Sequence, residues 1–432
     1  MSAHESNESE RPVGIAPGPA TRAQQLAVDL QDERLIREEG LGGAIRGFGR
    51  RVRAGDLGSL PVIVGLVVIW AIFEILNPKF LSASNLVDLA LQCAPVGVIA
   101  LGVVLVLLLG EIDLSVGSVS GLAAAILGVG MTKLGWPILL AVIVAIAAGV
   151  AIGALYGMLF TRFGVPSFVI TLAGLLGFLG VQLWVLGPLG SINLSFSSWI
   201  VQFANGWFLP PWLGYLLALV AALAVLFSDL RRARRRRAAG LSVPALSITV
   251  IKVVALAVVL SLIELVLARD RGTGVMFVFF IALVVLMNFL LTRTRWGRSI
   301  YAVGGNVEAA RRAGINTRFV YLSVFVLCSV FAIVGGLLSA ARLSAATQSA
   351  GSGDVNLNAI AAAVIGGTSL FGGRGSAWSA LLGIVVIQSI SSGLTLLNLD
   401  ASVRYVITGA VLLIAVIVDS VSRRSRASHG QA

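Results

Sequence analysis

The 432-residue sequence has little charge and almost no histidine. Only 12% of its residues are charged, about half of the ~25% usual in soluble domains. Its two histidines, His4 and His429, lie in polar segments near the two ends. The scarcity of charge excludes a water-soluble globule. The position of the two histidines excludes a histidine-containing metal site or a Ser/His/Asp arrangement inside the apolar part of the chain. The two cysteines, Cys93 and Cys328, fall in separate apolar stretches, so we expect packing residues and no disulfide framework.

Apolar sequence dominates instead. Hydrophobic residues make up 57% of the chain and the mean hydropathy is +0.96. Uncharged runs of about 20 residues are long enough to cross a bilayer as helices and too long for the strands of an ordinary barrel. We therefore predict an all-α polytopic membrane protein with about twelve transmembrane helices. The runs are 59–76, 86–109, 114–132, 136–161, 166–186, 211–227, 245–267, 272–291, 319–341, 356–371, 377–397 and 403–418.

Polar segments flank the apolar region. Residues 1–57 have no apolar core of the kind that a signal peptide needs, so we expect a cytoplasmic tail that carries an interfacial basic helix near 41–53. Residues 58–420 are predicted to form one transmembrane domain, and 421–432 a second cytoplasmic tail. The distribution of arginine and lysine favours this orientation, because most basic residues near membrane ends then lie inside.

Two segments of the predicted transmembrane domain each allow two interpretations. The run 356–371 is short for a span, so it is either re-entrant or a short crossing broken at Gly366 and Gly367, which the charge distribution favours. Six arginines between 231 and 237 resemble a nucleic-acid patch, but they lack interleaved aromatic residues. Between two apolar runs, an anchor that contacts anionic lipid headgroups is the better interpretation.

Glu111 and Asp113 stand out at the junction GEIDLSVGSVSG, because charge at membrane depth is costly. One hypothesis is a gate in which a carboxylate pairs with Arg374, in GGTSLFGGRGS, or with Arg162. The alternative is that the acids cap the helix that begins at the following apolar run. The two junctions resemble each other, and glycine-interrupted segments in two halves are a pointer to a transport pathway.

Neutral polar side chains inside the predicted spans form a second candidate set. Their amides can bind a hydroxyl-rich solute without selecting for charge, or they can bridge two helices. As candidates for a substrate pathway we take Gln92, Gln182, Asn288 and Gln388.

The strongest signal lies in the loop 293–318, which carries six arginines and is predicted to face the cytoplasm. Within it the sequence E-A-A is followed, after three residues, by a glycine. Small residues on a short helix fit closely into another protein's groove, and arginines can pair with acids at its rim. The alternative is an ordinary basic connector. The candidate docking residues are Gly304, Gly305, Asn306, Glu308, Ala309, Ala310, Arg311, Arg312 and Gly314.

Three stretches in this order and spacing resemble the permease subunit of bacterial ATP-binding-cassette sugar importers of the ribose and xylose type. They are GEIDLSVGS at 110–118, AVGGNVEAARRAGIN at 302–316 and AAAVIGGTSLFGGRGS at 361–376. Ribose-type members have ten spans, so an extra apolar pair around 231–237 favours the xylose-type subgroup. The resemblance implies a homodimer in the inner membrane that receives a monosaccharide from an extracytoplasmic binding protein. It also implies a cytoplasmic ATPase that docks on the loop containing Glu308 and Gly314.

The sequence supports a separate source of energy. None of its three lysines follows a glycine, so the motif G-x-x-x-x-G-K-[ST] is absent and the chain does not supply a P-loop. We expect no catalytic residue, metal or cofactor in this chain, and ATP to be used by the partner. Two alternatives stay open. One is a permease of the same superfamily for branched-chain amino acids or nucleosides, and the other is a gradient-driven secondary transporter or channel.

Overall fold

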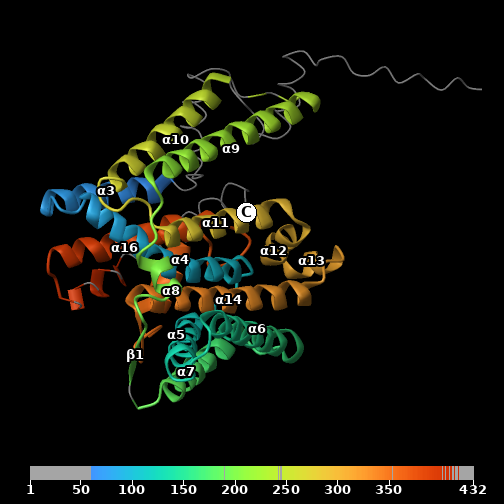
Figure 1. Cartoon of the computed structure of the whole chain (residues 1–432). Coiled ribbons are helices and arrows are strands. Elements are labelled where there is room, and N and C mark those ends of the chain that lie inside the picture. Colours follow the sequence, from blue (N-terminus) through green and yellow to red (C-terminus); the bar gives the residue numbers. More distant parts are fainter. Residues whose placement is uncertain are drawn as a thin grey trace, which may run out of the picture. The chain divides into compact units, whose positions relative to one another are not determined.

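The computed structural model describes residues 60–400, except 189, 242, 244, 245 and 353, together with a few positions between 402 and 417. Helices make up most of this part of the chain (Figure 1). In order, the elements are α3 (Leu60–Leu76), α4 (Ala83–Leu108), α5 (Val116–Thr132), α6 (Ile138–Phe163), α7 (Ser167–Leu186), β1 (Ser191–Asn193), α8 (Trp199–Asn205), α9 (Pro211–Ala238), α10 (Leu246–Leu267), α11 (Val275–Arg293), α12 (Arg295–Gly305), α13 (Val307–Arg312), α14 (Thr317–Leu343), β2 (Ala345–Thr347), α15 (Asp354–Ile365) and α16 (Ala377–Leu396).

The prediction of an all-α polytopic protein is confirmed. Eight helices in the described residues are long and apolar enough to span a membrane, and α3, α5 and α15 are shorter apolar helices. Together they coincide with eleven of the twelve predicted runs. Most of the twelfth run, 403–418, lies outside the described residues, as do both predicted tails and the basic helix near 41–53. Helix α15 ends at Ile365, directly before the glycine pair at which a break is predicted.

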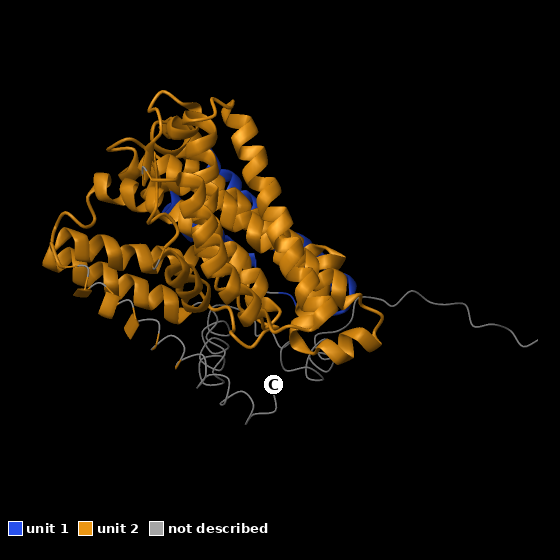
Figure 2. Ribbon diagram, turned by 90° about the horizontal axis from the view of Figure 1, so that it is seen from below, with its two compact units in different colours: residues 1–54, 216–260 blue, residues 55–215, 261–432 orange. Residues whose placement is uncertain are grey.

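The predicted transmembrane domain divides into two compact units (Figure 2). One contains residues 216–260, which include most of α9 and α10. Within it, Lys252 pairs with Asp229 at 2.9 Å, and the guanidinium of Arg231 lies 4.1 Å from the centre of the Phe227 ring. The other unit contains the described residues of 55–215 and 261–432, and it holds every site discussed below.

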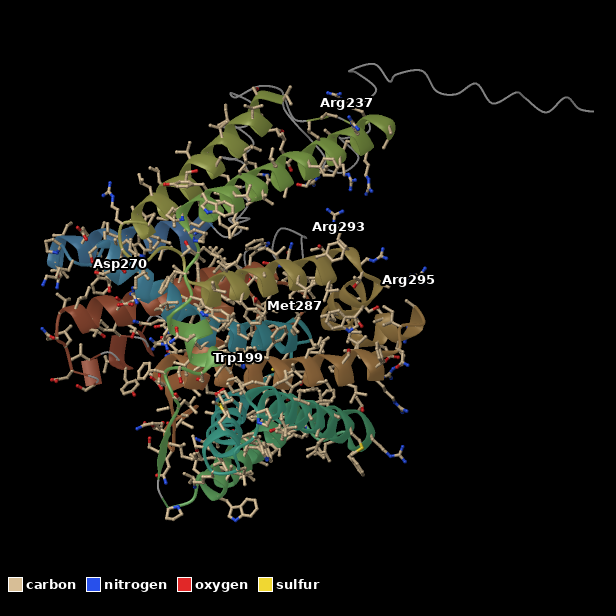
Figure 3. All side chains as sticks on the ribbon, in the orientation of Figure 1. Trp199, Arg237, Asp270, Met287, Arg293 and Arg295 are labelled. Atoms are coloured by element: carbon tan, nitrogen blue, oxygen red, sulfur yellow. The ribbon has the colours of Figure 1, made fainter. Side chains whose placement is uncertain are left out.

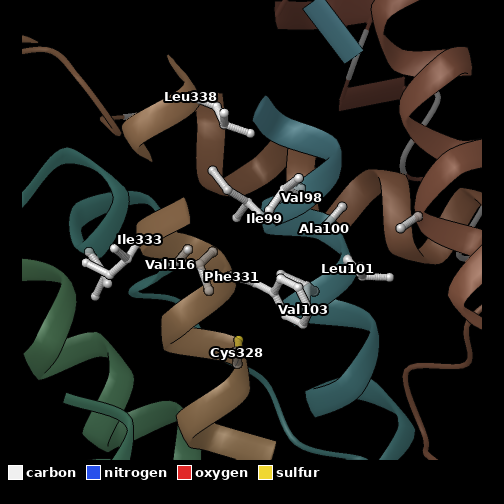
Figure 4. Packing of buried hydrophobic residues seen from close by; sticks show 14 of the residues in the cluster. Val98, Ile99, Ala100, Leu101, Val103, Val116, Cys328, Phe331, Ile333 and Leu338 are labelled. Carbon is white, nitrogen blue, oxygen red and sulfur yellow. The ribbon is translucent and has the colours of Figure 1, made fainter. Parts of the chain in front are cut away.

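Helix α14 is central to the larger unit, where it packs against α4, α5 and α6. Figure 4 shows Cys328 and Phe331 of α14 beside Val103 of α4. At Gly102 of α4, an added Cβ would lie only 3.0 Å from the carbonyl oxygen of Cys328, so the two backbones approach closely. Such close approach lets membrane helices gain van der Waals contact that lipid tails do not give.

A second close contact joins α6 to α14. Gly149, Gly153 and Gly157 recur at four-residue spacing and therefore lie on one face of α6. At Gly153 an added Cβ would lie 2.5 Å from the carbonyl oxygen of Phe325, and at Gly157 it would lie 2.8 Å from Cα of Leu322. This small-residue face is what allows α6 to pack directly on the α14 backbone.

The segment after α7 folds back on the segment after α14. Strands β1 and β2 pair antiparallel, with Ile192 opposite Ala346, and both of these side chains are buried. Gln182 of α7 holds the end of β2 and the residues that follow it. Its buried amide nitrogen contacts the carbonyl oxygens of Thr347, Gln348 and Ala350 at 2.9 to 3.3 Å.

Candidate functional site

The predicted docking loop folds into the two short helices α12 and α13 between α11 and α14. Polar side chains set where each helix begins, because a side-chain oxygen accepts a backbone N–H that the first turn leaves unpaired. Thr294 accepts the N–H of Gly297 at 3.1 Å, and Asn306 accepts the N–H of Ala309 at 2.9 Å. Asn316 does the same for Phe319 at the start of α14. Asn306 is therefore a capping residue in this structure.

Helix α13 has one side exposed and one side packed on its own chain. Glu308, Ala309, Arg311 and Arg312 are exposed, whereas Ala310 is buried. Glu308 lies 3.5 Å from Arg311 and 3.8 Å from Arg312 in intrahelical ion pairs. Exposed ion pairs of this kind contribute only about 0–1 kcal/mol to stability. Each arginine can therefore leave Glu308 and pair with an acid of another protein at little cost.

The remaining candidate docking residues fall into two groups. Gly305, Asn306 and Gly314 are exposed, and Gly314 has φ of 81°, a left-handed conformation that favours glycine. Gly304 faces inward against the end of α4, where an added Cβ would collide with the carbonyl oxygen of Leu108. The exposed surface of this region is thus formed by the outward side of α13 and its two flanking turns.

This region lies at one end of α11. Figure 3 shows Arg293 and Arg295 where α11 gives way to α12, and Trp199 and Asp270 toward the opposite end of α11. At that opposite end Arg271 pairs with Asp88 and Asp270, and these two pairings raise its pKa against the opposing effect of burial. Trp199 and Trp207 are partly exposed there, at 45% and 47%.

The acidic junction lies in the connection 109–115 between α4 and α5. Gly110, its second residue, has φ of 79°, and Glu111 then accepts a hydrogen bond from the Ser167 hydroxyl at 2.6 Å. Burial raises the pKa of Glu111, and the bond from Ser167 offsets part of that effect. The side chain of Glu111 thereby holds the connection to the first turn of α7.

Asp113 is buried, at 2% exposure, and its carboxylate bonds Ser115 just before α5 and Cys328 of α14. Its Oδ1 accepts the backbone N–H and the hydroxyl of Ser115 at 2.8 and 2.7 Å, and its Oδ2 accepts the Cys328 thiol at 3.6 Å. Tyr156 of α6 donates to the Ser115 hydroxyl at 2.9 Å. Burial raises the pKa of Asp113, while these donors lower it. We call Asp113, Ser115, Tyr156 and Cys328 the Asp113 cluster.

The structure differs from both interpretations of the acidic junction. Among the described residues, no ion pair joins Glu111 or Asp113 to Arg374 or Arg162, because hydroxyl and thiol donors occupy the two carboxylates. Nor does either acid cap α5, since Asp113 accepts the N–H of Ser115, the residue that precedes the first turn. The two junctions do meet, through their backbones: Gly373 donates its N–H to the carbonyl oxygen of Leu108 at 2.9 Å.

The four candidate pathway residues have different environments. Gln182 is fully buried and bonded to its own backbone, so in this structure it bridges segments of the fold. Gln92 of α4, Asn288 of α11 and Gln388 of α16 are partly buried. These three helices pack against one another, so three neutral amides lie on one set of neighbouring helices.

The sequence contains no signal for the hydrogen-bond partners of Glu111 and Asp113. Ser167, Tyr156 and Cys328 stand in apolar runs where nothing distinguishes them from packing residues, and helix contacts alone bring them to the connection 109–115. The expectation that both cysteines are buried and unpaired is confirmed. No group of three potential metal-ligating acids, histidines or cysteines occurs in the part of the chain that the structure describes.

Comparison with known proteins gives consistent matches over most of the chain. The family model described as branched-chain amino acid transport system / permease component matches residues 85–416. The xylose transport system permease protein XylH of Escherichia coli (strain K12) is 37% identical over 346 residues, which cover 80% of this chain and 87% of the relative. No solved structure gives a significant match.

Two further relatives extend the same similarity. The XylH protein of Haemophilus influenzae is 34% identical over 376 residues, which cover 87% of this chain and 99% of the relative. The ribose import permease protein RbsC of Escherichia coli (strain K12) is 32% identical over 362 residues, covering 83% of this chain and 92% of the relative.

Proposed function

Because the chain belongs to the family of permease components of branched-chain amino acid transport systems, we propose that it is the membrane-spanning subunit of an importer for a monosaccharide, with a xylose-like pentose favoured. The resemblance drawn from the three sequence motifs is confirmed by the matches to xylose and ribose permeases. The chain is a multi-pass protein of the cytoplasmic membrane. The similarity to XylH over 346 residues is the observation that carries the proposal.

Sugar as the substrate agrees with the side chains available in the spans. Gln92, Asn288 and Gln388 are partly buried neutral amides, and each can donate to or accept from a hydroxyl group. A zwitterionic amino acid carries charges of both signs, which charged side chains or helix ends would have to match at its site. The amides supply hydrogen bonding without that charge.

A separate ATPase is proposed to supply the energy, since the sequence has no P-loop motif. We assign its docking site to the exposed side of α13, with Ala309 at the centre and Arg311 and Arg312 at the rim. The chain itself is proposed to use no cofactor and to have no ATPase site.

Two other partners complete the proposal. An extracytoplasmic sugar-binding protein would deliver substrate at the opposite end of α11, where Trp199 and Trp207 are partly exposed. A second copy of the permease would complete the translocation path as a homodimer, surrounded by membrane lipid and without nucleic acid. Movement of the docking region then alternates access between the two sides.

The description of the matching family favours a second candidate, a branched-chain amino acid as substrate, and a nucleoside is the other substrate class proposed for a permease of this superfamily. A third, gradient-driven transport, would place an acid or histidine in mid-span as an ion relay. In the described spans, Glu74 and Glu264 lie near helix ends, and both contact neighbouring loops: Glu74 accepts the N–H of Leu81, and Glu264 accepts the Thr273 hydroxyl.

Uptake of radiolabelled xylose by cells that carry or lack the gene tests this proposal. We expect uptake to require the gene, to stop when ATP is depleted, and to persist in the presence of an uncoupler at maintained ATP. Excess unlabelled ribose, leucine and a nucleoside, added separately, identify the substrate class. Uptake that the uncoupler abolishes would contradict ATP-driven transport, and competition by leucine alone would contradict a sugar.

A further inference from the structure

Three segments of the larger unit meet with little more than backbone between them: the last turn of α12, the end of α4, and the loop after α15. Gly373 donates its N–H to the carbonyl oxygen of Leu108 at 2.9 Å. A Cβ at Gly304 would collide with that same oxygen and would lie 2.8 Å from the Gly373 nitrogen. We call Gly304, Leu108 and Gly373 the glycine contact.

The loop after α15 is shaped for this contact. Gly372 and Gly373 have φ of 81° and 71°, in the left-handed region where glycine is not penalised. A Cβ at Gly372 would lie 2.7 Å from the carbonyl oxygen of Gly304 and 2.9 Å from the Gly110 nitrogen. Side chains at these positions would therefore separate α12 from the start of the connection 109–115.

A hydrogen bond adds a second link between α12 and this loop. Tyr301, one turn before Gly304, donates its hydroxyl to the carbonyl oxygen of Gly375 at 2.9 Å. Burial raises the pKa of Tyr301, so the hydroxyl keeps its proton and stays a donor at physiological pH. The last turn of α12 thus contacts the loop after α15 at two points, through Gly304 and through the Tyr301 hydroxyl.

The far end of the connection 109–115 is held by the Asp113 cluster. Asp113 bonds Ser115 at the start of α5 and the Cys328 thiol of α14, and Tyr156 of α6 bonds Ser115. The seven residues 109–115 therefore link the region of α12 and α13 at one end to three membrane helices at the other.

We propose that the glycine contact transmits displacement of α12 and α13 to the connection 109–115, and through the Asp113 cluster to α5, α6 and α14. The inference rests on the proposed function, because the displacement comes from the ATPase that docks on α13. Backbone groups in direct contact have no rotamer freedom to absorb a small shift, whereas intervening side chains would have it. Gly304, Gly373 and Tyr301 are thus positioning residues for transport, separate from the docking surface.

Gly304→Ala is the sharpest test, since it adds one methyl group where the structure has no room. The matched control is Gly65→Ala in α3, where an added Cβ has nothing within 4 Å. Each variant is co-purified with its ATPase and reconstituted with the binding protein in proteoliposomes. The readouts are the amount of ATPase retained, the rate of ATP hydrolysis and the rate of sugar uptake.

We expect Gly304→Ala to retain its ATPase and to lose about fivefold or more of the sugar taken up per ATP hydrolysed, the lower range of usual coupling free energies. Gly65→Ala should match wild type in all three readouts. Tyr301→Phe removes the bond to Gly375 without adding bulk, so it tests the same link even where the added methyl group at Gly304 prevents folding. Tyr301→Phe should also lower the sugar taken up per ATP hydrolysed, but by less than Gly304→Ala does.

A wild-type ratio of uptake to hydrolysis in both Gly304→Ala and Tyr301→Phe would overturn the inference while leaving the proposed function intact. Loss of the bound ATPase in Tyr301→Phe would overturn it as well, because Tyr301 would then belong to the docking surface. If the wild-type chain recovers no ATPase and takes up sugar without ATP, the proposed function itself fails.

Discussion

Gly373 and Leu108 are joined by a backbone hydrogen bond of 2.9 Å although they lie far apart in the sequence. The bond brings together the two glycine-interrupted junctions that the sequence shows as GEIDLSVGS and GGTSLFGGRGS. The charges in these two junctions suggest an ion pair between a carboxylate of the first and Arg374 of the second. The structure instead joins them through main-chain atoms, beside the last turn of α12.

Asp113→Asn is expected to stabilise the chain relative to wild type, and increasingly so as the pH rises. Burial raises the pKa of Asp113, so the native chain binds a proton that the unfolded chain has already released. The free energy of unfolding of the wild-type chain therefore falls as the pH rises through the raised pKa of Asp113. Asparagine keeps an oxygen that accepts from Ser115 and carries no charge.

Thermal unfolding in detergent checks this prediction. The Tm of Asp113→Asn should converge with that of wild type at acid pH, where Asp113 is protonated in the native and the unfolded chain. It should exceed the wild-type Tm progressively as the pH rises above about 4, the ordinary pKa of an aspartate. A Tm difference that does not change with pH, or one that shrinks as the pH rises, would contradict the raised pKa of Asp113 on which the prediction depends.

Gln182→Leu is expected to lower stability by about 1–3 kcal/mol, because three partly buried carbonyl oxygens at the end of β2 and just after it lose their donor. The KM for sugar uptake should stay at the wild-type value, since the side chain is fully buried against its own backbone. Gln92→Leu is the matched substitution at a partly exposed position. It should leave Tm unchanged and raise the KM if Gln92 lines the pathway.

Measuring both Tm and KM distinguishes a side chain that bridges segments of the fold from one that lines the substrate pathway. A raised KM with unchanged Tm for Gln182→Leu would place this amide in the substrate pathway, as the sequence suggests, and would contradict the bridging role that its three contacts indicate.

Gly153→Ala is expected to destabilise the packing of α6 on α14 by about 1–3 kcal/mol, because the added methyl group would lie 2.5 Å from the carbonyl oxygen of Phe325. Gly177→Ala in α7 is the control, since its Cβ meets nothing within 4 Å. Thermal unfolding of both variants should show a lowered Tm for the first and an equal or higher Tm for the second. Equal Tm values would show that α6 and α14 are less closely packed.

Much of the fold is predictable from sequence because hydrophobic runs of membrane length have few alternatives to helices. The runs that become α4, α11 and α14 are found in this way, and so is the end of α15 before Gly366. The loop that forms α12 and α13 is found from its E-A-A sequence and glycines.

The contacts of the candidate site are not predictable in the same way. The packing of α14 brings Cys328 to Asp113, and the packing of α6 brings Tyr156 to Ser115. Both depend on which apolar faces meet, and helices that are hydrophobic on all sides give no periodic signal of that choice. Equally, the sequence does not show that Ala310 is buried while Ala309 is exposed.

The exposure of Ala309 gives the most direct test of the central claim, that this chain is the permease of an ATP-driven importer and that its ATPase docks on α13. Ala309→Trp adds bulk on the exposed side without disturbing Gly314, whose left-handed backbone would be strained by any larger residue. Ala239→Trp makes the same change at another exposed position, just after α9.

Tagged wild type and both variants are purified from the native host in mild detergent, and the proteins that elute with them are identified by mass spectrometry. The account predicts a P-loop ATPase with wild type and with Ala239→Trp, and its loss with Ala309→Trp. Recovery of the ATPase in equal amounts with all three would contradict docking on α13, and its absence from all three would contradict the ATP-driven importer.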